Sequence, residues 1–162
     1  MAYKLQKAVV EHILDDAHEY ACCMSGCNKV KVGSIILTSR GDYVKGSNRG
    51  LGYDCMKDGC HRVKLYGEAS KEHRLPSDCN SIHSEIDAIG KAAKRGICTA
   101  GSAIYITRYP CEACARAIVA AGIATVYYGR KQEISEYTKK ILEAGGVKVL
   151  HIKNWDAEDI LS

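Results

Sequence analysis

The apolar residues of the N-terminal segment recur with the period of a helix. Successive members lie one, three or four positions apart and form one stripe: Leu5, Val9, Val10, Ile13, Leu14, Ala17 and Ala21. Such a stripe is typical of an amphipathic helix with one side facing a core. We therefore predict a helix over residues 3–23 that packs against the rest of the chain.

Two strand-like runs follow this helix. The run KVGSIILT at residues 31–38 is rich in β-branched residues, SRGD is typical of a turn, and YVKGSN at residues 43–48 resumes the strand pattern. Strands joined by so short a turn pair antiparallel. Asn48 falls at the far end of this predicted hairpin, where asparagine is most often a turn residue.

From residue 83 onward, helical and strand patterns alternate. The predicted helices cover residues 83–95, 110–122 and 133–144, and the predicted strands cover 102–107, 123–128 and 147–152. The apolar helix faces consist of Ile86, Ile89 and Ala93, then Ala113, Ala117, Ile118 and Ala121, then Ile134, Tyr137 and Ile141. Such alternation builds parallel βαβ units. With the hairpin, it predicts one α/β domain over residues 1–162, a three-layer α/β/α sandwich with a five-stranded mixed sheet.

Residues 51–82 form a segment without a helical or strand period. An ordered loop of this length in a compact domain needs something that holds it, and a structural zinc ion is the natural candidate. Cys55, Cys60 and Cys79 are its predicted ligands. The fourth ligand stays open among His61, Cys22, Cys23 and Cys27. The alternative is a set of reduced cysteines without a metal.

The composition is that of a globular protein. Of the 162 residues, 46% are hydrophobic and 26% are charged, enough for one domain with a substantial core. Charged residues interrupt the apolar ones at the N-terminus, which predicts neither a signal peptide nor a membrane span, so we expect a cytoplasmic protein. The net charge of +4 is modest and spread among acidic residues, which is compatible with an anionic small molecule as ligand and is weak evidence for a nucleic acid.

The nine cysteines indicate metal binding rather than disulfides, because their number is odd and the N-terminus is not that of a secreted protein. Cys111 and Cys114 have the spacing of two metal ligands on one face of a helical turn, with Pro110 opening the helix. His83 is the obvious third ligand, and this set leaves the fourth zinc position open for water. Glu85 lies off the helix face of His83 and is therefore a candidate general acid/base.

The motifs HSE at residues 83–85 and PCEAC at residues 110–114 together resemble the HxE and PCxxC signature of zinc-dependent nucleobase deaminases. The run IYITRYPCEACARAIVAAGIATVYYG, and GSNRG around Asn48, are most similar to the deoxycytidylate (dCMP) deaminases of the cytidine and deoxycytidylate deaminase superfamily. The resemblance runs from about residue 32 to residue 128. It implies the cytidine-deaminase-like fold and a zinc ion held by His83, Cys111 and Cys114.

The resemblance also implies the reaction, which is hydrolytic deamination of dCMP to dUMP with release of ammonia. In the mechanism that the resemblance implies, Glu85 takes a proton from a water at the zinc ion and hands it to N3 of the pyrimidine, and the glutamate then protonates the departing amine. From the same resemblance we expect the Ser84 and Cys111 backbone amides to contact the ring, Asn48 to contact the sugar, and Tyr128 to close the nucleotide pocket. For Tyr128 the alternative is a core aromatic residue at a strand end.

Two positions depart from the pattern of the family. Ser47 stands where the family has tyrosine, and Asp87 stands where it usually has asparagine. Both departures concern the substrate rather than the metal site. A phosphate pocket needs cationic groups, for which the candidates are Lys29, Lys31, Arg49 and Arg108.

The resemblance extends to assembly and regulation. Enzymes of the dCMP deaminase type are commonly hexamers regulated by dCTP and dTTP, sometimes with magnesium, and several hold a second zinc in the corresponding insertion. We therefore expect a homohexamer with nucleotide regulation. The alternatives are a deaminase of cytidine, a tRNA adenosine, guanine, or a pterin or riboflavin precursor, and a zinc-binding module without turnover. Glu85 discriminates, because a structural site gains nothing from it.

Overall fold

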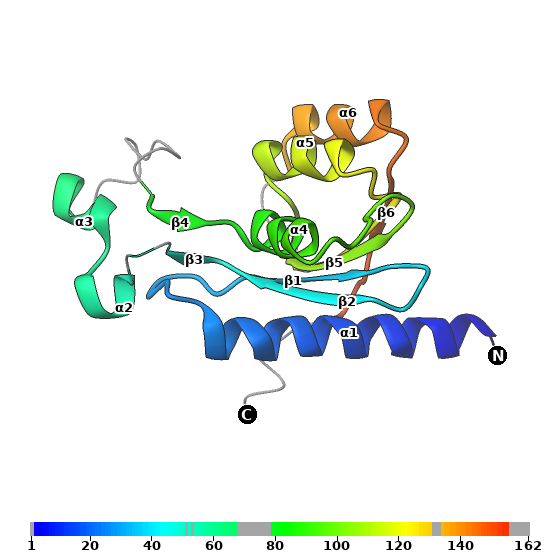
Figure 1. Ribbon diagram of the computed structural model, residues 1–162, viewed down its shortest axis with the longest axis horizontal. Coiled ribbons are helices and arrows are strands. Elements are labelled where there is room, and N and C mark those ends of the chain that lie inside the picture. Colours follow the sequence, from blue (N-terminus) through cyan, green and yellow to red (C-terminus); the bar gives the residue numbers. More distant parts are fainter. Residues whose placement is uncertain (1, 51, 53, 68–78, 131–133, 156–162) are drawn as a thin grey trace.

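Figure 1 shows the computed structural model, which describes residues 2–50, 52, 54–67, 79–130 and 134–155. Five strands form a mixed sheet in the order β2-β1-β5-β6-β7. Their bounds are Gly33–Leu37 (β1), Tyr43–Ser47 (β2), Ala103–Arg108 (β5), Thr125–Arg130 (β6) and Lys148–His151 (β7). Strand β1 pairs antiparallel with β2 and β5, while β5, β6 and β7 run parallel. The predicted five-stranded mixed sheet is confirmed.

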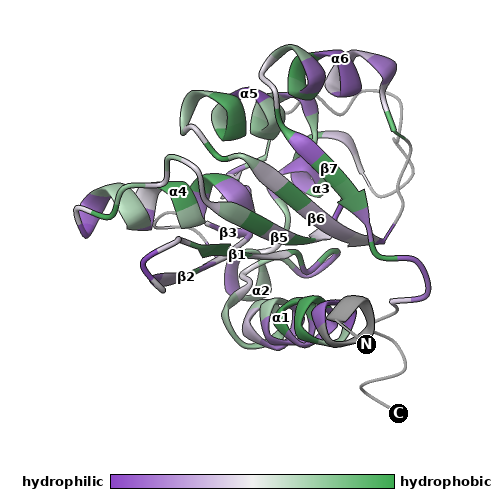
Figure 2. Ribbon diagram, turned by 90° about the vertical axis from the view of Figure 1, so that its right-hand side faces the viewer, coloured by the Kyte–Doolittle hydropathy of each residue, from purple (hydrophilic) through white to green (hydrophobic). Residues whose placement is uncertain are grey.

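The sheet lies between two helical layers. The helices are α1 (Ala2–Met24), α4 (Ser84–Lys94), α5 (Glu112–Ala120) and α6 (Glu136–Ala144). Helix α1 covers one face, and the other three cover the opposite face (Figures 1 and 2). One core cluster lies under α4, α5 and α6, around Ile104 and Ile118, and a second lies under α1, around Leu14 and Ile35. The predicted α/β/α sandwich is confirmed.

Helix α1 buries most of the predicted stripe but not all of it. Its buried residues are Val10, Ile13, Leu14, Ala17 and Ala21. Val9 is 52% exposed, so its prediction as a core residue is wrong. A four-residue repeat turns about 40° around the helix axis at each step, which carries Val9 away from the side that faces the sheet. The side chain of Leu5 lies outside the described residues.

The core-facing sides of the later helices also differ from the predicted ones. The buried residues are Ser84, Glu85, Asp87, Ala88 and Ala92 on α4, Cys114, Ala115 and Ile118 on α5, and Thr138 and Leu142 on α6. Ala93, Ala113 and Tyr137 were predicted to face inward and are exposed. Alanines occur on several sides of α4 and α5, so their spacing does not determine which side meets the sheet. Glu133, the predicted start of the last helix, lies outside the described residues.

Two glycines let helices approach the sheet closely. A Cβ atom at Gly33 of β1 would overlap the backbone carbonyl of Ala17, and one at Gly46 of β2 would overlap that of Ser84. No other residue fits at either position unless the helix moves. Gly46 therefore sets how near the first turn of α4 lies to the hairpin.

In the insertion, residues 51–82, the described residues include two short helices, α2 (Cys55–Asp58) and α3 (His61–Tyr66). The prediction that no regular structure occurs there is wrong for these residues. Near its ends β3 (Arg49–Gly50) pairs with β4 (Ser81–Ile82), while residues 51, 53 and 68–78 lie outside the described part. Neither helix buries a residue, and each is ended by a glycine with positive φ. Because nothing is buried, the sequence shows no hydrophobic period here.

The segment after β7 returns to α1, although no sequence pattern predicts a role for it. Trp155 is 8% exposed, and its indole nitrogen donates a hydrogen bond to the carboxylate of Asp15 at 2.7 Å. Its ring lies against Gly129 of β6, where a Cβ atom would overlap it. This tryptophan therefore joins α1 to the end of the sheet.

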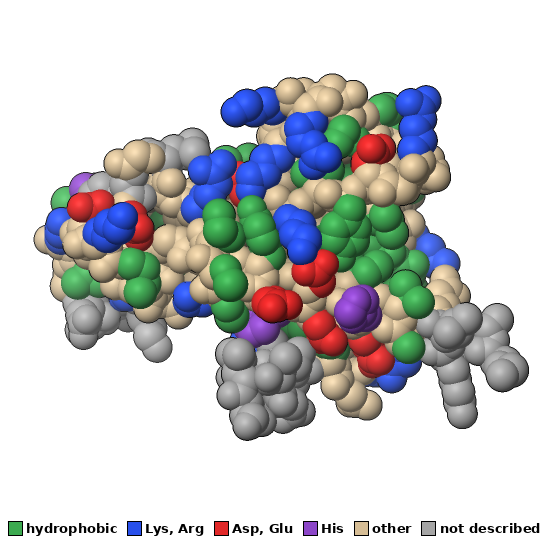
Figure 3. Space-filling view, turned by 60° about the horizontal axis from the view of Figure 1, so that its bottom comes forward, with side chains coloured by type: hydrophobic (Ala, Val, Ile, Leu, Met, Phe, Trp, Pro, Cys, Tyr) green, Lys and Arg blue, Asp and Glu red, His purple; other side chains and the backbone are tan. Residues whose placement is uncertain are grey.

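The surface carries charges of both signs. Figure 3 shows the face to which α1 belongs, where basic and acidic side chains are interspersed. In the part of the chain that the structure describes, no helix is long and apolar enough to cross a membrane.

Candidate metal centre and active site

The beginnings of two helices carry the predicted metal ligands. His83 is the N-cap residue of α4, directly after β4, and Cys111 is the N-cap residue of α5, which follows β5. Both N-cap residues have extended backbone conformations, so the chain turns sharply at the start of each helix. Pro110 precedes the cap rather than standing in the first turn, which corrects the predicted helix start by two residues.

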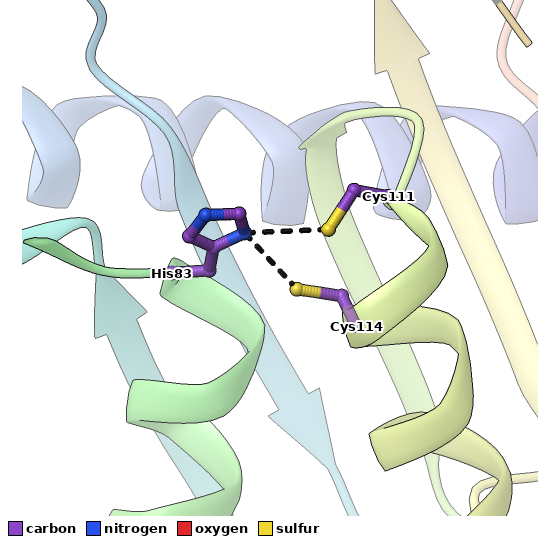
Figure 4. A group of neighbouring side chains, drawn as sticks. All are labelled: His83, Cys111 and Cys114. Atoms are coloured by element: carbon purple, nitrogen blue, oxygen red, sulfur yellow. Dashed lines mark hydrogen bonds between the residues drawn. The ribbon is translucent and has the colours of Figure 1, made fainter. Parts of the chain in front are cut away.

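The three predicted ligands converge (Figure 4). The sulfur atoms of Cys111 and Cys114 lie 3.4 Å and 3.3 Å from Nδ1 of His83, and all three ligand atoms lie within 4.8 Å of one another. Tetrahedral zinc with ordinary bond lengths separates sulfur and nitrogen ligands by about 3.5 Å. The spacing and the donor set both fit zinc. Cys114 is buried and His83 is exposed, so the group opens to one side.

The two thiols of this group differ in acidity. A hydrogen bond from Cys114 stabilises the thiolate of Cys111 and lowers its pKa to about 4. The same hydrogen bond, together with burial, raises the pKa of Cys114. The hydrogen bond with Cys111 raises the pKa of His83 above 6.5. These side chains thus share protons in the absence of a cation, and a bound cation would replace those protons.

Glu85 lies beside the group, inside the protein. It is 4% exposed, and its carboxylate accepts a hydrogen bond from the hydroxyl of Ser84 at 3.0 Å. The Ser84 hydroxyl in turn shares a hydrogen bond with Ser34 of β1 at 2.6 Å. Burial raises the pKa of Glu85. A carboxyl group with a raised pKa next to a metal centre is suited to both accept and return a proton.

A cavity of about 340 Å³ opens at this centre. His83, Glu85 and Cys111 line it together with Asn48 and Tyr109. This volume is in the range of sites for small ligands such as a nucleotide. Metal ligands, candidate acid/base and cavity therefore form one site.

The sequence and the site agree with a known family. Residues 7–130 match the model of the cytidine and deoxycytidylate deaminase zinc-binding region. The chain belongs to this family. Its zinc-binding region thus includes the two helix starts that bring His83, Cys111 and Cys114 together.

Several curated proteins of the family are similar in sequence. ComE operon protein 2 of Bacillus subtilis is 31% identical over 131 residues, covering 80% of this chain and 64% of that protein. The deoxycytidylate deaminase of Enterobacteria phage T2 is 34% identical over 94 residues, covering 54% of this chain and 50% of that protein. The human deoxycytidylate deaminase is 30% identical over 99 residues, covering 60% of this chain and 52% of that protein. The chain spans between half and two thirds of the length of these curated relatives.

Solved structures share the fold. The dCMP deaminase of cyanophage S-TIM5, in complex with dCMP and dUMP, aligns with a TM-score of 0.66 at 24% identity, covering 89% of this chain and 96% of that one. The diaminohydroxyphosphoribosylaminopyrimidine deaminase/reductase of Thermotoga maritima aligns with a TM-score of 0.66 at 19% identity, covering 96% of this chain and 39% of that one. The expected cytidine-deaminase-like fold is confirmed.

Asn48 has a structural role and also lines the cavity. Its side-chain oxygen accepts hydrogen bonds from the Ser25 hydroxyl at 2.7 Å and from the Val32 backbone at 2.9 Å, and its nitrogen donates to the Val30 carbonyl at 2.7 Å. These bonds hold the segment between α1 and β1 against the end of β2. The contact to a sugar stays a prediction, for which the second N–H of the amide is available.

Asp87, which departs from the family pattern, is the centre of a charged network. Its buried carboxylate accepts hydrogen bonds from the Ser47 backbone at 3.1 Å, from Arg49 at 2.9 Å and from Lys91 at 2.7 Å. Burial alone would raise the pKa of Asp87, but these bonds outweigh it and lower the pKa below 3.8. Asp87 thus holds the chain on both sides of Asn48, a role that sequence analysis missed.

The candidate phosphate ligands separate into two groups. Lys29 and Arg108 line the cavity. Arg49 is engaged by Asp87, and Lys31 donates to the carbonyl of Cys22 at 3.0 Å. The structure adds Arg62 of α3, which lines the cavity and was not predicted.

Tyr128 does not line the cavity formed by the described residues. It is 6% exposed and stacks on His151, with ring centroids 4.7 Å apart. Its ring also meets that of Tyr109 edge to face, at 4.9 Å, and Tyr109 does line the cavity. The structure therefore favours the alternative interpretation of Tyr128 as a core aromatic residue.

The cysteines of the insertion gather loosely near the same cavity. Cys60 and Cys79 line it with Cys27, and Cys55 is close enough to all three for their charges to raise its pKa, after burial, the largest cause. Within the described residues, only the group at His83 has three ligand atoms within 4.8 Å of one another. Of the candidate fourth ligands, Cys22 instead contacts His18, at 3.5 Å. Two other candidates lie near Cys55, since Cys27 acts on it electrostatically and the backbone of His61 forms a hydrogen bond with it.

Proposed function

We propose that this protein catalyses the hydrolytic deamination of dCMP to dUMP with release of ammonia. The observation that carries the proposal is the convergence of His83, Cys111 and Cys114 beside the buried carboxyl group of Glu85, in a cavity large enough for a nucleotide. Membership of the deaminase family and the names of the deoxycytidylate deaminase relatives support it.

His83, Cys111 and Cys114 would hold the zinc ion of the reaction. When bound, zinc supplies a water molecule activated for attack at neutral pH. Glu85 would accept a proton from the attacking water and deliver it to N3 of the pyrimidine as the water oxygen bonds to C4. It would then take the remaining proton of that hydroxyl group and give it to the amine, so that ammonia leaves as the C4–N bond breaks and the C4 carbonyl forms. Burial of Glu85 suits this role, because a carboxyl group with a raised pKa returns its proton readily.

The groups around the cavity suit a pyrimidine nucleotide. In the proposed complex the backbone amides of Ser84 and Cys111 contact the ring, and Asn48 contacts the sugar. Lys29 and Arg108 are the lining residues, among those predicted, that can neutralise a phosphate. The structure of the cyanophage dCMP deaminase with dCMP and dUMP supports this choice of substrate.

A second, structural zinc ion is part of the proposal. Cys27, Cys55, Cys60 and Cys79 would bind it if they closed together, since Cys60, Cys27 and Cys79 all lie near enough to Cys55 to act on it electrostatically. Four thiolates form the closed coordination sphere of a structural site. Neither α2 nor α3 buries a residue, so the metal would supply the stability that a core supplies elsewhere.

The proposed enzyme is a cytoplasmic homohexamer regulated by dCTP and dTTP, with Mg²⁺ accompanying the regulatory nucleotide. Gel filtration of the purified chain, with and without dCTP and MgCl2, tests this assembly. A 17.7 kDa monomer under both conditions would overturn it.

A substrate screen tests the proposed activity. Purified protein of measured metal content is incubated with dCMP, CMP, deoxycytidine, cytidine, guanine and adenosine, and ammonia release is followed by a coupled assay. We expect dCMP to be the best substrate and at least one zinc per chain. Preference for another base would redirect the assignment within the family. Release of ammonia from none of them by zinc-loaded protein would favour a zinc-binding module without turnover.

A further inference from the structure

The insertion forms part of the wall of the active-site cavity. Helix α3 contributes Arg62 and Val63, and its flanking residues Cys60 and Gly67 line the cavity as well. These residues meet His83 and Glu85 across the same space. The insertion is therefore part of the wall of the candidate site.

The lining of this cavity is positively charged. Among the described lining residues are three permanently cationic side chains, Lys29, Arg62 and Arg108, and one carboxylate, Glu85. Arg62 is near enough to act electrostatically on His83. The Nε atom of Arg108 is buried and has no hydrogen-bond partner within the described residues. A cavity with this excess of positive charge favours an anion over a neutral ligand.

We propose that Arg62 is a specificity-determining residue that binds the 5′-phosphate of the substrate and so distinguishes a nucleoside monophosphate from the free nucleoside. A guanidinium group presents paired N–H donors that match two oxygens of a phosphate. Arg62 belongs to the first turn of α3, and the N-cap residue of that helix, Cys60, also lines the cavity. This inference rests on the proposed deamination of a pyrimidine nucleotide.

The chain offers a matched control on the same helix. Lys64 lies two residues after Arg62 and is exposed, and it is absent from the cavity lining. Arg62→Gln and Lys64→Gln remove the same charge from α3, but only the first removes it from the cavity. Arg62→Lys keeps the charge and loses the paired donors.

The decisive measurement is kcat/KM for dCMP and for deoxycytidine with each variant. For Arg62→Gln we expect a fall of about 10-fold to 100-fold with dCMP, mainly through KM, and a change below about twofold with deoxycytidine. Arg62→Lys should restore part of the loss, and Lys64→Gln should leave the ratio of the two substrates unchanged. Equal losses with both substrates, or an unchanged ratio in Arg62→Gln, would overturn the role of Arg62.

A binding experiment separates this inference from the proposed function. Calorimetry compares dUMP with deoxyuridine on wild-type protein and Arg62→Gln, with zinc content and circular dichroism confirming that both are folded. Loss of the preference for dUMP in the variant supports the inference even if turnover is absent. If wild-type protein deaminates dCMP but Arg62→Gln retains the full preference for dUMP, the inference fails and the proposed function stands.

Discussion

The two cysteine groups beside the cavity are built in different ways. Cys111 and Cys114 sit at the start of α5, whose buried residues join the main core cluster, and Cys114 itself is 0% exposed. Cys55 begins α2 and Cys60 caps α3, and neither of these short helices buries a residue. The first group is brought to ligand distance by hydrophobic packing of the elements that carry it. The second has no such support and needs a bond of its own to become rigid.

The comparison predicts that a substitution beside the first group can abolish catalytic activity while the fold and the arrangement of the metal ligands stay unchanged. Glu85→Gln is the strongest test of this prediction. The substitution keeps the size of the side chain and its ability to accept a hydrogen bond from Ser84, but it removes the proton acceptor. We expect kcat for dCMP to fall by about 100-fold to 10,000-fold. Steady-state ammonia release measures the loss.

A control for this variant lies on α5. Glu112→Gln removes a carboxylate that is paired at the surface with Arg116, at 2.7 Å, and should leave kcat within about twofold. Zinc content and thermal unfolding should match the wild type in both variants. Full turnover by Glu85→Gln would remove the proposed acid/base and with it the mechanism.

A substitution in the second group should have the opposite effect. The insertion should lose its ordered structure while the catalytic activity is retained. In Cys55→Ser we expect zinc to fall from about two ions per chain to about one, because a structural site needs its full set of thiolates. Proteolysis within residues 55–67 should become faster, while kcat for deoxycytidine stays within a few-fold. Metal analysis and mass spectrometry of the cleaved chain provide the measurements.

Cys98→Ser is the control for Cys55→Ser, because Cys98 is an exposed cysteine that belongs to neither group. It should keep both zinc ions and the wild-type cleavage pattern. One zinc per chain in the wild type, with no change in Cys55→Ser, would mean that the insertion is ordered without a metal.

The same contrast explains what could be predicted from the sequence. Sheet, helices and the meeting of His83 with Cys111 follow from apolar periodicity and from the HxE and PCxxC spacings, since those patterns reflect burial and ligation directly. Helices α2 and α3 were not predicted, because capping residues form them without burial. Each ends at a glycine, and the Asp54 side chain accepts a hydrogen bond from the Met56 backbone at 2.9 Å at the start of α2. Arg62 was not predicted for the same reason. Without a predicted helix at residues 61–66, the sequence does not show that its side chain lines the cavity.

Asp87 and Trp155 could not be predicted for another reason. Each acts through partners far away in sequence, Asp87 through the Ser47 backbone and Trp155 through the carboxylate of Asp15. A single sequence shows neither the register of β2 nor the path of the last segment. Only the departure of Asp87 from the family pattern indicated that its surroundings differ.

Asp87→Asn should have an effect of intermediate size on both substrate binding and stability. It removes the charge that holds Arg49 and Lys91, so the segment carrying Asn48 loosens. We expect KM for dCMP to rise about 10-fold with kcat within about threefold, and the free energy of unfolding at pH 7 to fall by about 1–3 kcal/mol. Kinetics and urea unfolding measure the two effects.

The pH dependence of this loss has a definite sign. The folded-state pKa of Asp87 lies below 3.8, so its stabilisation is complete above that pH and disappears as the pH falls through the folded-state pKa. The stability difference between wild type and Asp87→Asn should therefore shrink in acid. Asp16→Asn is the control, since Asp16 accepts from Tyr43 at 2.7 Å on the α1 side of the sheet. It should lower stability without changing KM.

The smallest expected effect belongs to Tyr128→Phe, a substitution in the core cluster that also supports the first group. Tyr128→Phe keeps the ring that stacks on His151 and meets Tyr109, and removes only the hydroxyl. If Tyr128 is a core residue, kcat/KM for dCMP should change by less than about twofold, whereas Tyr128→Ala should cost about 3–5 kcal/mol of stability. If the hydroxyl instead contacts the nucleotide, Tyr128→Phe would lose activity at unchanged stability. Because the two roles move different measurements, kinetics and urea unfolding on this pair of variants decide between them.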